Sequence, residues 1–240
     1  SAGTEAYALD LGALPRAPRV GVADDAVFAP GSHARRCQLL DADYVAARRA
    51  GTVSCEEYTT ALVKRARYLR YMNHFIFNTY DRLDQAVAAA AELDATAEAE
   101  GVEAIAPLYG LPIPMKGTAA VVDYPSGSGS GVLSGYTPVK DSGTPWPSWP
   151  CHTLTSDEIV DTDLTALIKE KNGIILGCTN VPEFAASART VNPASGQTRN
   201  AYSHALTVGG SSGGAGSAVA SYVAPIAVTE DTGGSTRIPA

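Results

Sequence analysis

Residues 209–220 read GGSSGGAGSAVA and residues 229–240 read TEDTGGSTRIPA, so two glycine–serine clusters follow each other closely in the chain. Each cluster adjoins an apolar segment that we expect to be a helix or a strand, which would hold both loops between rigid elements. Successive glycines let backbone N–H groups converge on one point, and an anion or oxyanion site is built in this way. Flexible turns are the alternative interpretation of such runs, but this setting favours a functional site.

Several known motifs fail to account for these clusters. A phosphate-binding P-loop needs a lysine directly after its last glycine, and neither cluster has one. Residues 209–213 satisfy G-x-S-x-G, but that hydrolase motif requires a downstream acid and then a histidine, and the last histidine is His204. The S-x-x-K motif is absent as well. We therefore expect a serine hydrolase whose base is not histidine, and we expect structural or surface roles for all the histidines: His33, His74, His152 and His204.

Lysine can replace histidine as the base if burial keeps it neutral. Lys116 ends the apolar run Leu111 to Met115, which has the pattern of a short buried strand. The other lysines have polar neighbours or lie on an expected helix surface, namely Lys64, Lys140, Lys169 and Lys171. Lys116 is therefore the candidate base.

With these residues in view, the chain resembles the amidase signature hydrolases over about residues 40–240. The resemblance lies in LPIPMKG (111–117), ILGCTNVPEFA (175–185) and the two clusters, in this order. It implies that Lys116 is the catalytic lysine, that Ser211 is the bridging serine after a cis peptide bond, and that Ser235 is the nucleophile. It further implies a backbone oxyanion hole at Thr232, Gly233 and Gly234, and a small side chain near the site at Ala185.

The implied chemistry is hydrolysis of a carboxamide without metal or cofactor. Neutral Lys116 would take a proton from Ser211, which would take one from Ser235 as that hydroxyl attacks the amide carbonyl to form an acyl-enzyme. Two other interpretations stay open. One is the amidotransferase subunit that releases ammonia from glutamine for tRNA-linked glutamate, which would need partner subunits. The other is a non-catalytic fragment or pseudo-amidase that serves in binding or assembly.

The pattern of elements predicts an α/β fold with a mostly parallel mixed sheet flanked by helices. We expect N-terminal helices at 41–49, 54–71 and 83–100, and Ser54 with Glu57 has capping-box spacing. Strand 111–115, helix 164–171 and strand 174–177 would follow, then helix 213–224 and strand 226–229. Residues 1–37 are expected to form an irregular arm and 38–240 an amidase signature domain with an insertion at 143–163.

The resemblance also implies two departures from the family. Gly117 stands where an aspartate commonly follows the lysine. Family members continue well beyond the nucleophile, so we expect the domain to be incomplete at its C-terminus and residues 1–240 alone to be marginally folded and poorly active.

Composition excludes several other classes of protein. The net charge is −7 and no Lys/Arg-rich stripe is present, which argues against nucleic acid as the main partner. No apolar run reaches the roughly 18 residues of a membrane span. Four cysteines without a C-x-x-C pair fit neither a zinc site nor a disulfide framework. We expect a small-molecule amide as substrate and a cytoplasmic location, and the sequence leaves the oligomeric state open.

Overall fold

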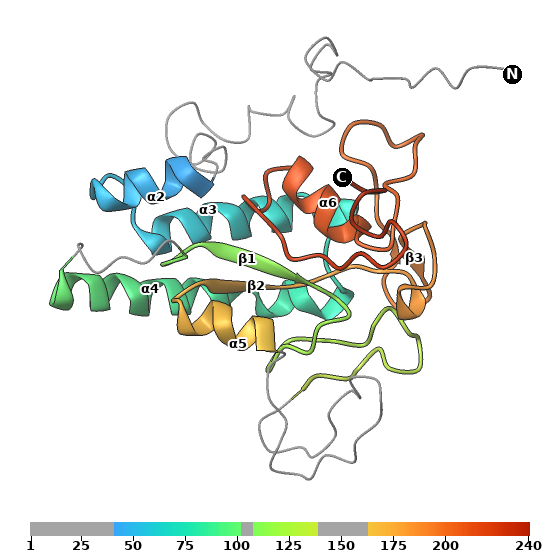
Figure 1. Cartoon of the computed structure of the whole chain (residues 1–240), viewed down its shortest axis with the longest axis horizontal. Coiled ribbons are helices and arrows are strands. Elements are labelled where there is room, and N and C mark those ends of the chain that lie inside the picture. Colours follow the sequence, from blue (N-terminus) through green and yellow to red (C-terminus); the bar gives the residue numbers. More distant parts are fainter. Residues whose placement is uncertain (1–40, 102–107, 139–162) are drawn as a thin grey trace, which may run out of the picture.

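The computed structural model describes residues 41–101, 108–138 and 163–240 (Figure 1). The expected N-terminal arm (1–37) and the expected insertion (143–163, apart from Asp163) lie outside the described residues. Within the described ranges, three helices precede a parallel pair of strands and a glycine-rich C-terminal region.

The three N-terminal helices are α2 (Asp41–Arg49), α3 (Cys55–Tyr68) and α4 (Leu83–Glu100), as predicted. The α3 helix begins with the predicted capping box, in which Ser54 and Glu57 satisfy each other's backbone N–H groups. It ends earlier than predicted, at Tyr68, and two 3₁₀ turns follow, η1 (Arg70–Met72) and η2 (Phe77–Arg82). The α4 helix ends before Gly101, whose φ of 92° suits glycine.

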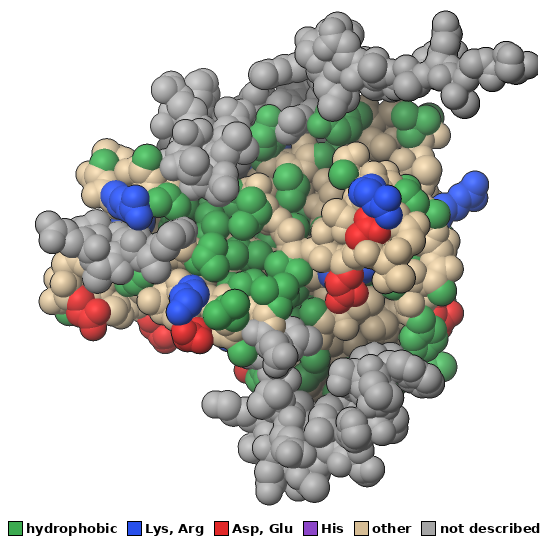
Figure 2. All heavy atoms as spheres, viewed as in Figure 1, with side chains coloured by type: hydrophobic (Ala, Val, Ile, Leu, Met, Phe, Trp, Pro, Cys, Tyr) green, Lys and Arg blue, Asp and Glu red, His purple; other side chains and the backbone are tan. Residues whose placement is uncertain are grey.

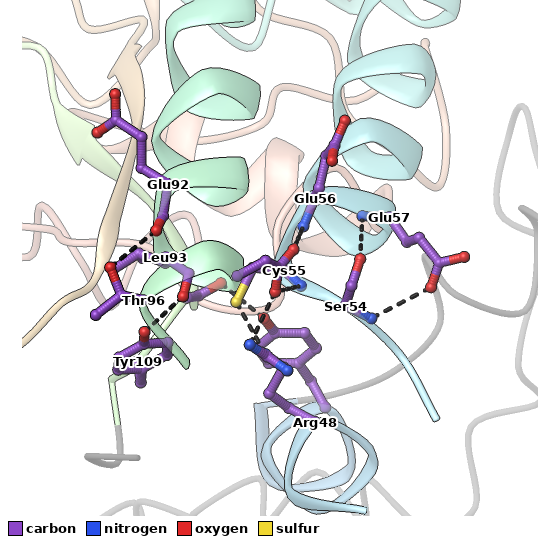
Figure 3. A network of polar contacts seen from close by, with 12 residues as sticks. Arg48, Ser54, Cys55, Glu56, Glu57, Glu92, Leu93, Thr96 and Tyr109 are labelled. Atoms are coloured by element: carbon purple, nitrogen blue, oxygen red, sulfur yellow. Dashed lines mark hydrogen bonds and ion pairs between the residues drawn. The ribbon is translucent and has the colours of Figure 1, made fainter. Parts of the chain in front are cut away.

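A carboxylate from α4 joins the three helices. Asp94 accepts hydrogen bonds from the backbone N–H groups of Cys55 (2.9 Å) and Glu56 (2.8 Å) at the start of α3. Arg48 of α2 forms an ion pair with Asp94 at 2.8 Å and donates to the Cys55 thiol at 3.0 Å. Figure 3 shows Arg48 and Cys55 pointing toward each other beside the capping box. These contacts fix the angle at which the N-terminal helices meet.

The central strands are β1 (Pro112–Lys116) and β2 (Ile174–Thr179), which pair in parallel with Lys116 opposite Thr179. Every residue of both strands is buried, as in sheets covered on both faces. The helices α4 and α5 (Asp163–Glu170) contact β2, and α6 (Gly213–Ala220) contacts β1 and β2. Hydrophobic side chains also gather over the region of these strands on the face in Figure 2.

A short antiparallel hairpin, β3 (Val191–Asn192) with β4 (Gly196–Gln197), accompanies the parallel pair, so the fold is α/β with mixed strand directions. Two further predicted elements differ from the structure, the helix at 213–224 and the strand at 226–229. The helix predicted at 213–224 ends at Ala220, because Tyr222 takes a left-handed backbone conformation. Two hydrogen bonds close the helix there: Tyr222 N–H donates to Val219 O, and Val223 N–H donates to Ala218 O.

The prediction of a strand at 226–229 is wrong. This segment runs beside β1 but joins it through the hydrogen bond from Val228 N–H to Pro114 O (2.9 Å), with no continuous ladder. The segment nevertheless leads the chain from α6 to the second glycine–serine cluster at the end of β1. Among the described helices, none has the length and apolar character needed to cross a membrane.

Candidate active site

Lys116 is the last residue of β1, and its side chain is only 2% exposed. The other described lysines, Lys64, Lys169 and Lys171, are exposed, so the strand carries Lys116 inward as predicted. Its Nζ donates to the backbone oxygen of Glu230 at 3.1 Å. Burial lowers the pKa of Lys116 below its ordinary value, while the carboxylates of Glu230 and Asp231 oppose this effect. A lysine in this position is closer to the neutral form that a base requires.

Close packing accounts for the glycine after the lysine. A Cβ on Gly117 would overlap the backbone oxygen of Thr179 and would press on the Ile76 side chain. An aspartate at this position would therefore collide with the end of β2, where Thr179 pairs with Lys116.

The first glycine–serine cluster forms a tight loop before α6. The Gly210–Ser211 peptide bond is cis, as the resemblance implies, and Ser211 is fully buried. Thr190 fixes the loop, because its N–H and hydroxyl both donate to Gly209 O while its Oγ1 accepts from Gly213 N–H. Gly214 lies against the backbone of Asn180, where a Cβ would overlap. The glycines thus bring the loop into contact with the end of β2.

The second cluster is organised by Asp231. Its carboxylate accepts from the N–H groups of Gly234 (2.7 Å), Thr236 (3.0 Å) and Arg237 (3.1 Å). The Arg237 guanidinium adds two hydrogen bonds of 3.0 Å each, and with the backbone donors it holds the pKa of Asp231 well below the usual range. Arg237 therefore has a structural role in this loop, and these contacts hold Ser235 in a closed turn.

Hydrogen bonds join the two clusters and the lysine. Ser212 N–H donates to Ser235 O at 3.1 Å, and Lys116 Nζ donates to Glu230 O. The predicted proton path itself is not hydrogen-bonded in this conformation, because the buried Ser211 hydroxyl has no partner within the described part of the chain. These hydrogen bonds bring the segments of Lys116, Ser211 and Ser235 together, while the Ser211 hydroxyl itself is not hydrogen-bonded to any residue in the described ranges.

The residues of the expected oxyanion hole differ in whether their backbone N–H groups are already hydrogen-bonded. Gly234 N–H is bonded to Asp231, whereas the N–H groups of Thr232 and Gly233 donate to no other residue in the described ranges. Gly234 has a φ of 111°, a conformation suited to glycine. Of these three residues, Thr232 and Gly233 therefore keep their N–H groups free of hydrogen bonds within the described ranges.

Ala185 belongs to the short turn η4 (Glu183–Ala185), where Phe184 and Ala185 both have positive φ. The turn is tied to the loop of small residues at 125–135 by the hydrogen bond from Phe184 N–H to Ser128 O (2.8 Å). The backbone that follows, residues 187–189, packs directly on Gly210. Ala185 thus lies in the segment beside the first cluster, half-buried and without a bulky side chain.

Neither described histidine has the position of a catalytic base. His74 is fully buried, its Nε2 lies 3.2 Å from Ser221 Oγ, and burial lowers its pKa to about 3. His204 is on the surface with its ring edge against Tyr71. His33 and His152 lie outside the described residues. Within the described ranges, no cluster of three or more His, Cys, Asp or Glu side chains is arranged to hold a metal.

Sequence comparison finds similarity to the Amidase family profile and to amidotransferase subunits. The profile of the Amidase family matches residues 154–240. The A-type subunit of glutamyl-tRNA(Gln) amidotransferase from Mycolicibacterium vanbaalenii is 35% identical over 205 residues, which are 84% of this chain and 37% of that protein. The protein of the same name from Acidothermus cellulolyticus is 35% identical over 206 residues, 86% of this chain and 35% of that protein. The chain spans little more than a third of the length of these relatives.

Solved structures share the fold. A fatty acid amide hydrolase superposes with a TM-score of 0.72 at 22% identity, over 92% of this chain and 35% of that one. Peptide amidase from Stenotrophomonas maltophilia superposes with a TM-score of 0.66 at 24% identity, over 84% of this chain and 38% of that one. A bacterial aryl acylamidase described as an amidase signature enzyme superposes with a TM-score of 0.68 at 25% identity, over 84% of this chain and 37% of that one.

Proposed function

The chain belongs to the amidase signature family, and on this basis we propose that it hydrolyses the C–N bond of a small carboxamide through Lys116, Ser211 and Ser235. The single observation that carries the proposal is the buried lysine at the end of β1. Its Nζ contacts Glu230, the residue that leads into the Ser235 loop, and burial lowers its pKa in the direction of the neutral base.

In the proposed reaction, Ser235 Oγ attacks the amide carbonyl carbon and passes its proton to Ser211, whose own proton goes to Lys116 Nζ. The N–H groups of Thr232 and Gly233 would stabilise the oxyanion, and one such donor is typically worth about 2.7–4 kcal/mol. The proton then returns through Ser211 to the leaving nitrogen, the C–N bond breaks, and water hydrolyses the acyl ester on Ser235.

The second candidate function is that of a glutamine-dependent amidotransferase A-type subunit. It is favoured by the names of the curated relatives, which are about 35% identical to this chain. The chemistry at the serine would be the same, with glutamine as the amide and ammonia passed to a partner protein. We disfavour a non-catalytic pseudo-amidase, since the buried lysine and both serines are retained.

Ammonia release distinguishes these functions. The purified chain is incubated with aliphatic and aromatic primary amides and with glutamine, alongside Ser235→Ala. An amidase releases ammonia from simple amides, and the variant loses this activity. Release restricted to glutamine, and increased by partner subunits, would identify the second function. Equal background rates from the wild-type chain and Ser235→Ala would reject hydrolysis at this site.

A further inference from the structure

Glu230 places a carboxylate beside the buried lysine. Its Oε2 lies 3.8 Å from Lys116 Nζ and accepts a hydrogen bond of 2.8 Å from the Thr118 hydroxyl. Its backbone oxygen is the acceptor for Lys116 Nζ at 3.1 Å. Lys116 therefore meets both the main chain and the side chain of one residue, which is 114 positions away in sequence and directly precedes the nucleophile loop.

We propose that Glu230 is a positioning residue for Lys116, and that the Glu230 carboxylate holds the lysine ammonium toward the nucleophile loop. Because a nearby carboxylate favours the ammonium, Lys116 would lose its proton at a higher pH with Glu230 than without it. This inference rests on the proposed function, in which Lys116 must lose its proton before it can accept one from Ser211.

The charges around Lys116 support this role. Two carboxylates favour its charged form, those of Glu230 and Asp231. Asp231 is engaged by Arg237 through two hydrogen bonds, so much of its negative charge is balanced locally. Glu230 contacts a neutral hydroxyl on Thr118, and Lys116 is the cation with which it forms an ion pair in the described ranges. Glu230 is therefore the carboxylate with the least compensated influence on the lysine.

The two side chains of this ion pair differ in their exposure to solvent. The Glu230 side chain is 55% exposed, while that of Lys116 is 2% exposed. Solvent screens an exposed carboxylate, so its effect on the lysine is weaker than that of a fully buried ion pair. We expect that removing this charge lowers the pKa of Lys116 further, because a nearby negative charge favours the ammonium.

Glu230→Gln removes the charge and retains an acceptor for Thr118. Two readouts are compared: the acidic limb of the pH–rate profile for amide hydrolysis, and NMR titration of ¹³Cε-labelled lysine, with Lys116→Arg identifying the signal. Both should move to lower pH than in the wild type, because the charge that favours the ammonium is gone. Glu230→Asp keeps the charge and should stay near the wild-type value. Glu170→Gln, which removes a surface partner of Lys171, is the matched control with the same change in net charge.

The outcomes separate this inference from the proposed function. A Lys116 signal that titrates at the same pH in wild type and folded Glu230→Gln overturns the role of Glu230, whatever the activity. A displaced NMR titration without turnover in the wild-type chain supports the role of Glu230 and rejects the proposed hydrolysis. An equal displacement in Glu170→Gln would assign the effect to net charge and overturn the inference.

Discussion

At the scale of single residues, Ser211 and Ser212 are neighbours with the same burial and different expected roles. Both hydroxyls are buried and have no hydrogen-bond partner in the described part of the chain. Burying a hydroxyl without a partner costs free energy, so such groups are retained where they serve a function. Ser212 also contributes its backbone N–H to Ser235 O, a contact that does not depend on its side chain.

These two serines provide a matched pair of variants. Ser211→Ala should lower kcat for amide hydrolysis by about a hundredfold or more, since it removes the group that passes the proton. Ser212→Ala should stay within a few-fold of wild type. Neither loses a hydrogen bond of the folded state, so both should melt near the wild-type temperature. Equal losses of activity in the two folded variants would refute the assignment of Ser211.

The sequence predicted Lys116 because an apolar, proline-edged run directly before a lysine indicates a buried strand end. Glu230 was missed, and no local signal could have found it, because its importance depends on a contact with a residue 114 positions away. The role of Asp231 was also missed, although an aspartate shortly before consecutive glycines has the spacing of a turn in which the carboxylate binds backbone N–H groups.

At the scale of elements, the start of α3 depends on two sources of acceptors. Ser54 and Glu57 cap it from its own sequence, and Asp94 caps it from α4 while it pairs with Arg48. Figure 3 shows Ser54 and Glu57 at the first turn of α3. The local cap could be predicted from the sequence. The cap supplied by Asp94 could not, because it requires the packing of α4 on α3.

Asp94→Ala should lower the free energy of unfolding by about 2–4 kcal/mol, because it leaves two backbone N–H groups and the largely buried Arg48 without their acceptor. Ser54→Ala should cost about 1 kcal/mol, the usual value for a lost N-cap. Glu98→Ala, on the exposed surface of α4, is the control and should change the free energy of unfolding by less than about 0.5 kcal/mol. Urea denaturation gives this order, and a smaller loss for Asp94→Ala than for Ser54→Ala would contradict it.

The predictions of elements succeeded where the signals are local. Capping residues, a helix-ending glycine and continuous apolar runs placed α2, α4, α5 and both parallel strands. The prediction failed at residues 226–229, since an apolar, extended segment becomes a strand only when a neighbour offers a continuous ladder.

At the scale of the whole molecule, His74 links folding to pH. It is buried without charge, and its folded pKa of about 3 lies below the ordinary value of 6.5. Between these values the unfolded chain binds a proton that the folded chain does not bind, so stability falls as pH decreases from about 6.5.

His74→Gln should remove this dependence, and its unfolding free energy should change less than that of wild type between about pH 5 and 6.5. Ser221→Ala is the control, because it removes the hydroxyl 3.2 Å from His74 Nε2 but no titrating group. Its loss of stability should be similar across this range. Urea denaturation at several pH values gives both results, and an unchanged slope in His74→Gln would show that another group is responsible.

The assignment of Ser235 as the nucleophile underlies the whole account, and the site of labelling by a fluorophosphonate probe tests it most directly. The probe loses fluoride and forms an O–P bond with an activated serine, which mass spectrometry of the digested protein locates. We predict one adduct, on Ser235, that is absent in Ser235→Ala, much slower to form in Lys116→Ala and retained in Ser212→Ala. An adduct on any other residue, undiminished labelling of Ser235→Ala, or no labelling of the wild-type chain would contradict the account.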